Sequence, residues 1–289
     1  MSKYIDFHCH SLYSDGNYSV NELIKKAKGE NVGFLSITDH DNIRSINDIK
    51  KYSLDTNITL INGIELSTVI LLDNKELYLH LLGYDFDSNN IKLLSELKRM
   101  REVLYRDNSI FLNSILNNVK NVPNCIVDEL DLYSYRLLEK QIRIILRKNN
   151  YDVNYIDNFI LLISKYFPTY EDYEIDFGSA IDIMRTSGGI SVLAHPNKIR
   201  ANDVDNIIKL LVNNGLNGIE TAHSSFLPSD FIKYSEIAKK YGLLESVGSD
   251  FHFPTPKKNV IIGHGIDGNL CKDDCSLKRY VLERKKKNG

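Results

Sequence analysis

Apolar and polar residues follow one another along the chain in blocks that predict strands alternating with helices. Residues 4–7 and 33–38 are short apolar runs typical of strands, and between them the apolar residues of 19–28 recur at helical spacing. Ser19 followed three positions later by Glu22 matches a capping box, so a helix is expected to begin there. The opening of the chain therefore predicts a β-α-β unit.

The alternation continues to about residue 84 and resumes after about residue 178. The further elements that it predicts are helices at 43–52, 179–187, 203–213 and 230–241, and strands at 59–65, 76–84, 189–194, 218–222 and 244–248. Strands that recur with helices between them favour a parallel arrangement of seven strands. If the sheet closes into a barrel, functional groups are expected at the carboxyl ends of its strands.

The segment from 87 to 177 interrupts this alternation. Its apolar pattern is mainly helical and it is too long for a connecting loop. A helical face is formed by Leu93, Leu94, Leu97, Met100 and Leu104, and further helices are predicted near 111–119 and 137–148. We therefore expect residues 1–86 and 178–289 to form the two parts of one barrel domain. Residues 87–177 are expected to form a helical insertion that caps the barrel mouth and limits substrate size.

Composition narrows the classes of protein to consider. The chain has 36 Lys and Arg against 38 Asp and Glu, a formal net charge of −2, so no overall basic field is present to hold a stable complex with long nucleic acid. A 43% hydrophobic and 26% charged composition is typical of globular proteins. No apolar run approaches the roughly 20 residues of a membrane span.

The cysteines and the start of the chain indicate the compartment. Cys9, Cys125, Cys271 and Cys275 are too few and too scattered for a disulfide framework, and the chain opens without an apolar signal segment. Both features predict a protein of the reducing cytoplasm.

Histidines and carboxylates gather where the predicted strands end. His8 and His10 flank Cys9, and the two-residue period of a strand turns both imidazoles to one face. A pair of strand histidines alone is weak evidence for a metal site, but other motifs follow other strands. They are Asp15, Thr38-Asp39-His40-Asp41, Gly63-Ile64-Glu65, His80, Ala194-His195-Pro196 and Gly248-Ser249-Asp250-Phe251-His252. A barrel mouth explains them together, although Asp15 could be a turn residue and His80 a core histidine.

Imidazole and carboxylate ligands suit divalent ions such as Zn, Mn or Fe. Six histidines and three carboxylates exceed the ligand set of one ion, so two or three ions are expected. Several close cations favour an anionic substrate and lower the pKa of a bound water toward neutrality. Hydrolysis of a phosphate ester follows from this chemistry.

Taken together, these motifs resemble the PHP (polymerase and histidinol phosphatase) family, over residues 4–84 and 180–265. The resemblance implies an α/β fold, a distorted seven-stranded barrel with a trinuclear metal site. It implies that His8, His10, Glu65 and Asp250 hold one ion, with Glu65 bridging to a second. His80 and His195 would complete the second site, and Asp15, His40 and His252 would hold the third ion.

Within that family, the motif order and the helical insertion are similar to stand-alone phosphoesterases. Those relatives remove the 3′-phosphate from nucleoside 3′,5′-bisphosphates or trim short RNA from its 5′ end. The resemblance therefore implies a metal-dependent phosphoesterase whose partner is a small phosphorylated substrate, a nucleotide or a short oligonucleotide. Their insertion carries an Arg-Pro-His-type segment, and this chain has residues 137–143 there without that motif.

Three further residues are candidates for contact with the substrate. His223 follows the sixth predicted strand, where it could protonate the leaving group or bind phosphate; the alternative is a rim histidine bonded to backbone. Arg143, in the insertion, and Lys257, beyond the seventh-strand motif, are the cations favoured for a second phosphate. Two other functions remain open: a histidinol-phosphate phosphatase with the same chemistry, and a non-catalytic PHP module.

Overall fold

The computed structural model describes residues 3–52, 57–134, 138–201, 203–254 and 259–288. The chain divides into two compact units. One unit comprises Met1–Leu94 and Glu174–Gly289, and the other comprises Ser95–Tyr173. Among the described helices, none combines the length and the apolar content that crossing a bilayer requires.

The first unit is built around a sheet whose strands run in the order β1-β2-β3-β4-β6-β7-β8. These strands are β1 (Tyr4–Asp6), β2 (Val32–Ile37), β3 (Thr59–Leu72), β4 (Lys75–Tyr84), β6 (Ile190–Leu193), β7 (Gly218–His223) and β8 (Leu244–Gly248). The short β5 (Ile175–Asp176) pairs with β3, and β9 (Val260–Ile261) pairs with β10 (Gly265–Ile266) in a separate hairpin. The seven predicted strands are confirmed, whereas the three short strands were not predicted.

The sheet closes on itself between its first and last strands. The Phe7 N–H donates to the Val247 carbonyl at 2.9 Å, and the Asp250 N–H donates to the His8 carbonyl at 2.7 Å. These bonds join the segment after β1 to the end of β8, so the predicted seven-stranded α/β barrel is confirmed.

One part of the parallel prediction is wrong. β4 is antiparallel to both of its neighbours, β3 and β6. The reason is a two-residue turn between Leu72 and Lys75, in which Asp73 and Asn74 have φ of 49° and 58°. Positive φ at both turn residues is typical of a tight hairpin, and a hairpin can connect only antiparallel strands.

The same hairpin changes where two predicted ligands lie. β3 continues to Leu72, so Glu65 lies within this strand and not at its end. His80 lies within β4, where it pairs in register with Ser67. Because β4 runs back from the turn, both side chains still reach the barrel rim.

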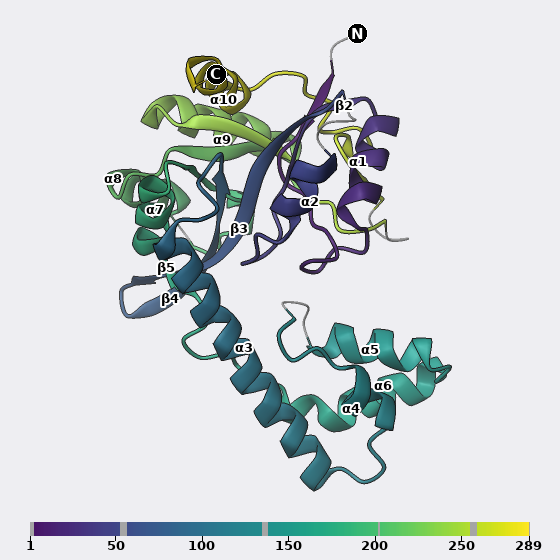
Figure 1. The fold of residues 1–289 in the computed structure, drawn as a ribbon. Coiled ribbons are helices and arrows are strands. Elements are labelled where there is room, and N and C mark those ends of the chain that lie inside the picture. The colour runs from purple at the N-terminus through teal and green to yellow at the C-terminus, as the bar shows by residue number, and fades with distance from the viewer. Residues whose placement is uncertain (1–2, 53–56, 135–137, 202, 255–258, 289) are drawn as a thin grey trace. The chain divides into compact units, whose positions relative to one another are not determined.

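Helices flank this sheet (Figure 1). They are α1 (Val20–Gly29), α2 (Ser45–Tyr52), α7 (Phe177–Thr186), α8 (Val204–Asn213), α9 (Pro228–Tyr241) and α10 (Ser276–Asn288), with a short 3-10 turn at Pro196–Lys198. The capping box before α1 is confirmed: the Glu22 N–H donates to Ser19 Oγ, and the Ser19 N–H donates to Glu22 Oε2 at 2.7 Å. Local sequence thus sets where α1 begins.

Two apolar clusters hold the first unit together. One joins residues of β1, β3, β4, β6, β7 and β8 with Leu277 and Val281 of α10. The other packs Leu23, Ile24 and Ala27 of α1 against β2. These helical positions are those that the apolar spacing predicted, and their burial anchors the strands that carry the rim residues.

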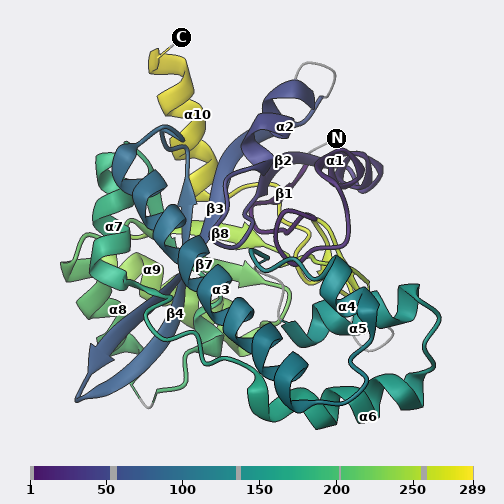
Figure 2. The same cartoon turned by 60° about the horizontal axis from the view of Figure 1, so that its bottom comes forward.

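The second unit is helical (Figure 2). It contains most of α3 (Ile91–Asn118), then α4 (Asn124–Glu129), α5 (Leu138–Lys148), α6 (Val153–Ile163) and a 3-10 turn at Ser164–Tyr166. Its core is its own, with Phe111, Ile142 and Phe159 among the buried residues. The helix predicted near 111–119 is the last part of the 28-residue helix α3, because the apolar spacing continues upstream to residue 91.

Candidate metal centre

His8 and His10 follow the end of β1, at the rim of the barrel. His8 and His10 are fully buried, and their rings lie 5.2 Å apart on one side of the chain. Cys9 faces the other way and its thiol donates to the Ser36 carbonyl at 3.4 Å. The two-residue alternation predicted from the sequence therefore places both imidazoles inside the rim.

Glu65 is the centre of the cluster. Its carboxylate is fully buried, and five imidazoles surround it. The nitrogen to oxygen distances are 3.0 Å from His8, 3.2 Å from His10, 3.4 Å from His40, 2.7 Å from His80 and 3.0 Å from His195. A carboxylate with two oxygens in contact with separate groups of histidines can bridge two cations.

Asp250 closes the rim from the end of β8. Its Oδ1 lies 3.5 Å from His8 Nε2 and 3.2 Å from His10 Nε2. Asp250 and His195 have φ of 55° and 27°, values that non-glycine residues rarely adopt. Such backbone conformations concentrate at functional sites, and here they occur at two of the predicted ligands.

The nine predicted ligands fall into overlapping groups that could each hold an ion. One group is His8, His10, Glu65 and Asp250; a second is His40, Glu65 and His80; a third is His10, Asp15, His40 and His252. His195 adds its Nε2 to the Glu65 oxygen that also faces His80. The structure thus brings together residues that lie up to 244 positions apart along the chain.

Some donor atoms of the rim histidines have no hydrogen-bond partner, and a bound cation would satisfy them. Both ring nitrogens of His10 and Nδ1 of His40 are buried and lack a hydrogen-bond partner among the described residues. His10 Nε2 is close to two carboxylates, yet its geometry is not that of a hydrogen bond. Buried polar atoms without partners are costly, and ligation of an ion removes that cost.

The charges of the cluster favour positive charge at its centre. Burial lowers the pKa of His10, but the carboxylates of Asp250 and Glu65 outweigh burial and raise it to about 10. Burial lowers the pKa of His40 to about 3 and that of His195 to about 4, so both rings are neutral near pH 7. Burial opposes ionisation of Glu65, yet His40 and His8 hold its pKa well below the ordinary value. The ionised Glu65 and the neutral His40 and His195 are in the forms that bind metal, whereas an ion bound at His8 and His10 would displace a proton from each ring.

Glu220 supports His8 from behind, and the sequence analysis missed it. This buried glutamate of β7 accepts from His8 Nδ1 at 3.1 Å and from the His195 N–H at 2.5 Å. With its Nδ1–H held by Glu220, His8 directs Nε2 at the cluster, where an ion would take the place of the Nε2 proton, an arrangement typical of metal-bound histidines. An acidic residue inside an otherwise apolar strand was the signal that could have revealed it.

Three buried aspartates fix the loops that carry the ligands. Asp39 accepts from the Ser11 N–H at 2.7 Å and Asp41 from the Ser67 N–H at 2.7 Å. Asp6 accepts from the Ser249 N–H at 2.9 Å. Asp39 and Asp41 belong to the motif around His40, but their oxygens bind backbone.

A second set of groups faces the other side of Asp250. Its Oδ2 lies 2.9 Å from Lys198 Nζ and 3.5 Å from His223 Nε2. Lys198 and His223 line a cavity of about 260 Å³ together with Ser224, Ser225 and Phe253. Lys198 was not predicted, although it lies only three residues after the predicted ligand His195. Asp250 and His252 line this cavity too, so a cavity with a cationic side chain adjoins the histidine cluster.

The tautomer of His223 follows from its contacts. The Ser225 N–H donates to His223 Nδ1 at 3.1 Å, so Nδ1 is an acceptor and the neutral ring carries its proton on Nε2. That Nε2 is buried and lacks a hydrogen-bond partner among the described residues. The Nε2 that carries this proton lies 3.5 Å from Asp250 Oδ2, and the ring lines the cavity.

Of the two predicted cations, the structure describes one. Arg143 lies on α5, where its guanidinium contacts Glu139 at 2.8 Å and Asp157 at 2.5 Å. Lys257 lies outside the described residues. Their contact with substrate stays a prediction.

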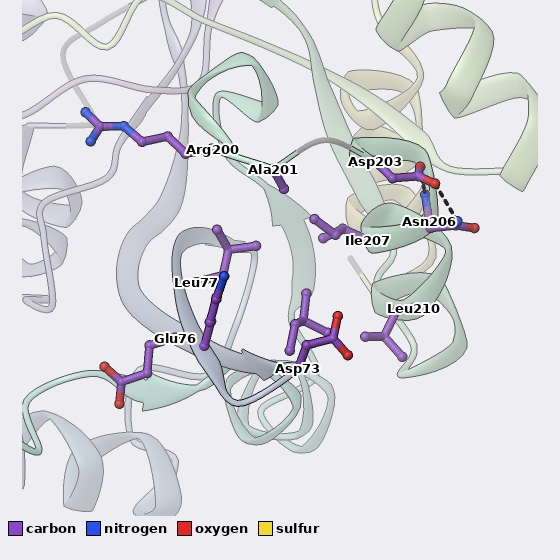
Figure 3. A pocket seen from close by; sticks show the side chains of 11 residues that line it. Asp73, Glu76, Leu77, Arg200, Ala201, Asp203, Asn206, Ile207 and Leu210 are labelled. Atoms are coloured by element: carbon purple, nitrogen blue, oxygen red, sulfur yellow. Dashed lines mark hydrogen bonds between the residues drawn. The ribbon is translucent and has the colours of Figure 1, made fainter.

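A larger cavity of about 520 Å³ lies elsewhere in the first unit, between the β3–β4 hairpin and α8 (Figure 3). Its lining combines Leu77, Ile207 and Leu210 with Arg200 and Asp203. Its lining as described includes carboxylates but no histidine, so it lacks the imidazole donors found at the rim.

The comparison with known families decides where the chain belongs. A family model described as PHP domain matches residues 6–214, more than half of the chain. The chain belongs to the PHP domain family. The matched residues of this PHP protein include the ligand motifs from His8 to His195, and Asp250 and His252 lie beyond the match.

Several curated proteins are similar to this PHP protein over most of their length. A 5′-3′ exoribonuclease of Haemophilus influenzae is 27% identical over 259 residues, 88% of this chain and 92% of the relative. A phosphoribosyl 1,2-cyclic phosphate 1,2-diphosphodiesterase of Eggerthella lenta is 25% identical, over 86% of this chain and 93% of the relative. A 3′,5′-nucleoside bisphosphate phosphatase of Chromobacterium violaceum is 25% identical, over 86% and 87%.

A solved structure shows the same fold. An amidohydrolase from Chromobacterium violaceum, crystallised with sulfate and no metal, aligns with a TM-score of 0.75 at 23% identity. The alignment covers 97% of this chain and 96% of that one.

Proposed function

We propose that this PHP protein is a metal-dependent phosphoesterase. Its substrate is a phosphate monoester of a small nucleotide, of the 3′,5′-bisphosphate type, or the end of a short oligonucleotide. The observation that carries the proposal is the set of overlapping ligand groups around the buried Glu65. The relatives support it, since each is named for the cleavage of a phosphate ester of a nucleotide, a sugar or RNA.

Two to three divalent ions, Mn, Zn or Fe, fit this donor set. His8, His10, Glu65 and Asp250 would hold one ion, and Glu65, His80 and His195 a second. Asp15, His40 and His252 would hold a third. Bound ions supply Lewis-acid polarisation of phosphoryl oxygens and a lowered pKa for water.

The residues beyond Asp250 are suited to the rest of the substrate. Lys198 brings a cation to the wall of the cavity, where it can bind a phosphoryl oxygen while it remains close to Asp250. His223 lines the same cavity and carries its proton on Nε2, from which it can donate a hydrogen bond to an oxygen of the phosphate or of the departing alcohol.

The proposal also covers the second phosphate of the substrate, the size of the substrate and the compartment. Arg143 and Lys257 would bind a second phosphate, and the helical insertion would limit substrate size. The protein would act in the cytoplasm on small phosphorylated molecules. Their chemistry agrees with a net charge of −2, which gives no general attraction for long nucleic acid.

A substrate panel tests the proposal. The full-length chain, reconstituted with Mn²⁺, is given adenosine 3′,5′-bisphosphate, a short 5′-phosphorylated oligoribonucleotide and histidinol phosphate, and product release is measured. We expect cleavage of the bisphosphate or the oligonucleotide. Cleavage of histidinol phosphate alone would establish the alternative phosphatase.

Metal content separates an enzyme from a non-catalytic module. We expect at least two equivalents of Mn²⁺ per chain after reconstitution at neutral pH. As a control, Asp182→Asn should bind the same number of equivalents, because Asp182 pairs with Lys92 on the exposed surface, away from the rim histidines. Fewer than two equivalents, with no turnover of any ester, would favour the module.

A further inference from the structure

Cys271 lies beside a histidine outside the metal centre. His264 is in the turn between β9 and β10, and the Cys271 Sγ is 3.3 Å from its Nδ1. The thiol is exposed to solvent. A nucleophile and a base within hydrogen-bond reach are the first requirement of an activated thiol.

The other nitrogen of His264 shows which way this pair is oriented. His264 Nε2 lies 3.0 Å from the Glu30 carbonyl oxygen and 3.4 Å from the Glu30 carboxylate. A carbonyl oxygen can only accept a hydrogen bond, so the Nε2 carries the ring proton and its N–H donates to the Glu30 carbonyl. The Nδ1 lone pair therefore faces the Cys271 thiol and can take its proton, and the Glu30 carboxylate stabilises the imidazolium that results.

The surroundings hold the imidazole in this orientation. The edge of the His264 ring meets the Tyr4 ring at a centroid distance of 4.9 Å. Its backbone is bonded on both sides, from its own N–H to the Ile261 carbonyl and from the Leu270 N–H to its carbonyl. Gly265 has a φ of 71°, and a Cβ there would lie 2.1 Å from Asn269 Oδ1. The turn is therefore built for glycine, which fixes the base beside the thiol.

The other three cysteines differ from Cys271. Cys9 and Cys275 are buried, and burial raises the pKa of the Cys275 thiol to about 11. Cys125 is half-buried, and burial raises its pKa as well. All four cysteines lie in the described residues, and of these only Cys271 combines exposure with an imidazole acceptor.

We propose that Cys271, His264 and Glu30 form a second reactive site, a nucleophilic thiol that is modified by small-molecule disulfides. His264 Nδ1 takes the proton from Cys271, and the thiolate attacks one sulfur of the disulfide. A new S–S bond forms to Cys271 as the original S–S bond breaks. The departing thiolate takes the proton from His264, so the products are a mixed disulfide on the protein and one free thiol.

A small-molecule disulfide fits this site for two reasons: Cys271 is exposed to solvent, and thiol–disulfide exchange balances in electrons. The exposed sulfur can be reached by a reagent larger than a peroxide. The exchange also conserves electrons between the two sulfur compounds, so it needs no further oxidant or reductant. Modification adds a substituent to the loop before α10, next to the buried Leu270 of the barrel core.

The test is the rate of modification of the full-length chain by the chromogenic disulfide dithiodipyridine at pH 7. We expect one fast thiol, with its mass shift on the peptide that contains Cys271. Cys271→Ser removes this fast phase, and Cys125→Ser, the matched control, leaves it unchanged. His264→Gln slows the phase by about tenfold, because glutamine can donate to Glu30 but cannot accept the proton. Glu30→Gln slows it by about two- to threefold, since the Glu30 carbonyl remains and only the carboxylate is lost.

The results that overturn the proposal are equally definite. A fast phase that survives Cys271→Ser places the reactive thiol elsewhere. An unchanged rate in His264→Gln, with the thiol count in denaturant and the melting temperature also unchanged, shows that exposure alone sets the reactivity. If His264→Gln unfolds, Glu30→Gln decides, because it leaves the ring and its bond to the carbonyl in place.

Discussion

Histidines in two regions of this molecule are placed for different chemistry. At the rim, His8 is fully buried, donates its Nδ1–H to Glu220 and turns Nε2 to the Glu65 carboxylate, where a metal ion would take the place of the Nε2 proton. In the β9–β10 turn, His264 is partly exposed, gives its Nε2 proton to Glu30 and turns a bare Nδ1 to a thiol. The comparison teaches that the partner of one ring nitrogen determines what the other can do.

His223 is a third case, and it falls between the two. It is buried like His8, but its Nδ1 accepts from the Ser225 N–H, so its Nε2 carries a proton. A ring held in that state is suited to donate and not to ligate. The rim therefore contains both ligand histidines and a donor histidine.

The largest effect is expected at the centre of the rim. Glu65→Gln removes the bridging charge that five histidines share, and we expect kcat to fall by about 10³-fold or more, the loss seen when a major charge-stabilising group is removed. Metal content measured on the same sample should fall by at least one equivalent. Full activity with full metal content would show that Glu65 is not a ligand.

His223→Ala tests the donor histidine. We expect kcat to fall by about 10²-fold, within the range for loss of a hydrogen-bond donor to developing charge, while metal content is unchanged. The loss should be smaller for substrates with acidic leaving groups, such as an aryl phosphate, because less charge needs to be stabilised on the departing oxygen. A loss below about threefold on every substrate would leave His223 as a rim residue bonded to backbone.

Glu220→Gln tests whether the partner of His8 matters. The amide keeps the shape of the side chain but removes the charge that holds the Nδ1 proton. We expect metal affinity to weaken by roughly 10- to 100-fold, as for other outer partners of metal-bound histidines. Titration with Mn²⁺ measures it, and an unchanged affinity would limit Glu220 to a packing role.

Lys198→Met tests whether the cation beside Asp250 acts on the substrate or on the histidine cluster. The methionine keeps much of the side-chain volume and removes the cation from the cavity wall. We expect KM to rise by about tenfold, the equivalent of about 1.4 kcal/mol of binding, with little change in metal content. If kcat falls and KM does not change, Lys198 acts on the cluster and not on the substrate.

Arg143→Gln is expected to have the smallest effect. Its guanidinium is shared between Glu139 and Asp157 on the surface of α5, and exposed ion pairs contribute at most about 1 kcal/mol to stability. If Arg143 binds a second phosphate, KM for the bisphosphate rises by about two- to threefold, and KM for a monophosphate does not. Equal effects on both substrates would end its candidacy.

Much of the fold and of the cluster could be predicted from local sequence. The apolar spacing located the seven strands and most helices, and Ser19 with Glu22 marked the start of α1. The two-residue period placed His8 and His10 on one face. These features depend on neighbouring residues, so their physical causes lie within a few positions of the chain.

Two other features, the reversal of β4 and the role of Glu220, left a signal in the sequence that the strand and helix pattern did not reveal. Asp73 and Asn74 favour a tight hairpin turn, which reverses β4, yet the repeated strand and helix pattern pointed to parallel strands throughout. Glu220 is an acidic residue in an apolar strand, but nothing nearby in the chain indicates that it meets His8, which lies 212 positions away.

The sequence by itself determined which residues form the elements and which side chains can bind a cation, since period, capping and donor chemistry are local properties. Only the tertiary structure decided which nitrogen of each histidine is free. Asp250, Lys198 and His223 became neighbours, and His264 came to lie between Glu30 and Cys271, because the closed sheet and the β9–β10 turn join segments that are far apart in the chain. Proton positions and buried charges depend on those distant partners, and a linear pattern does not contain them.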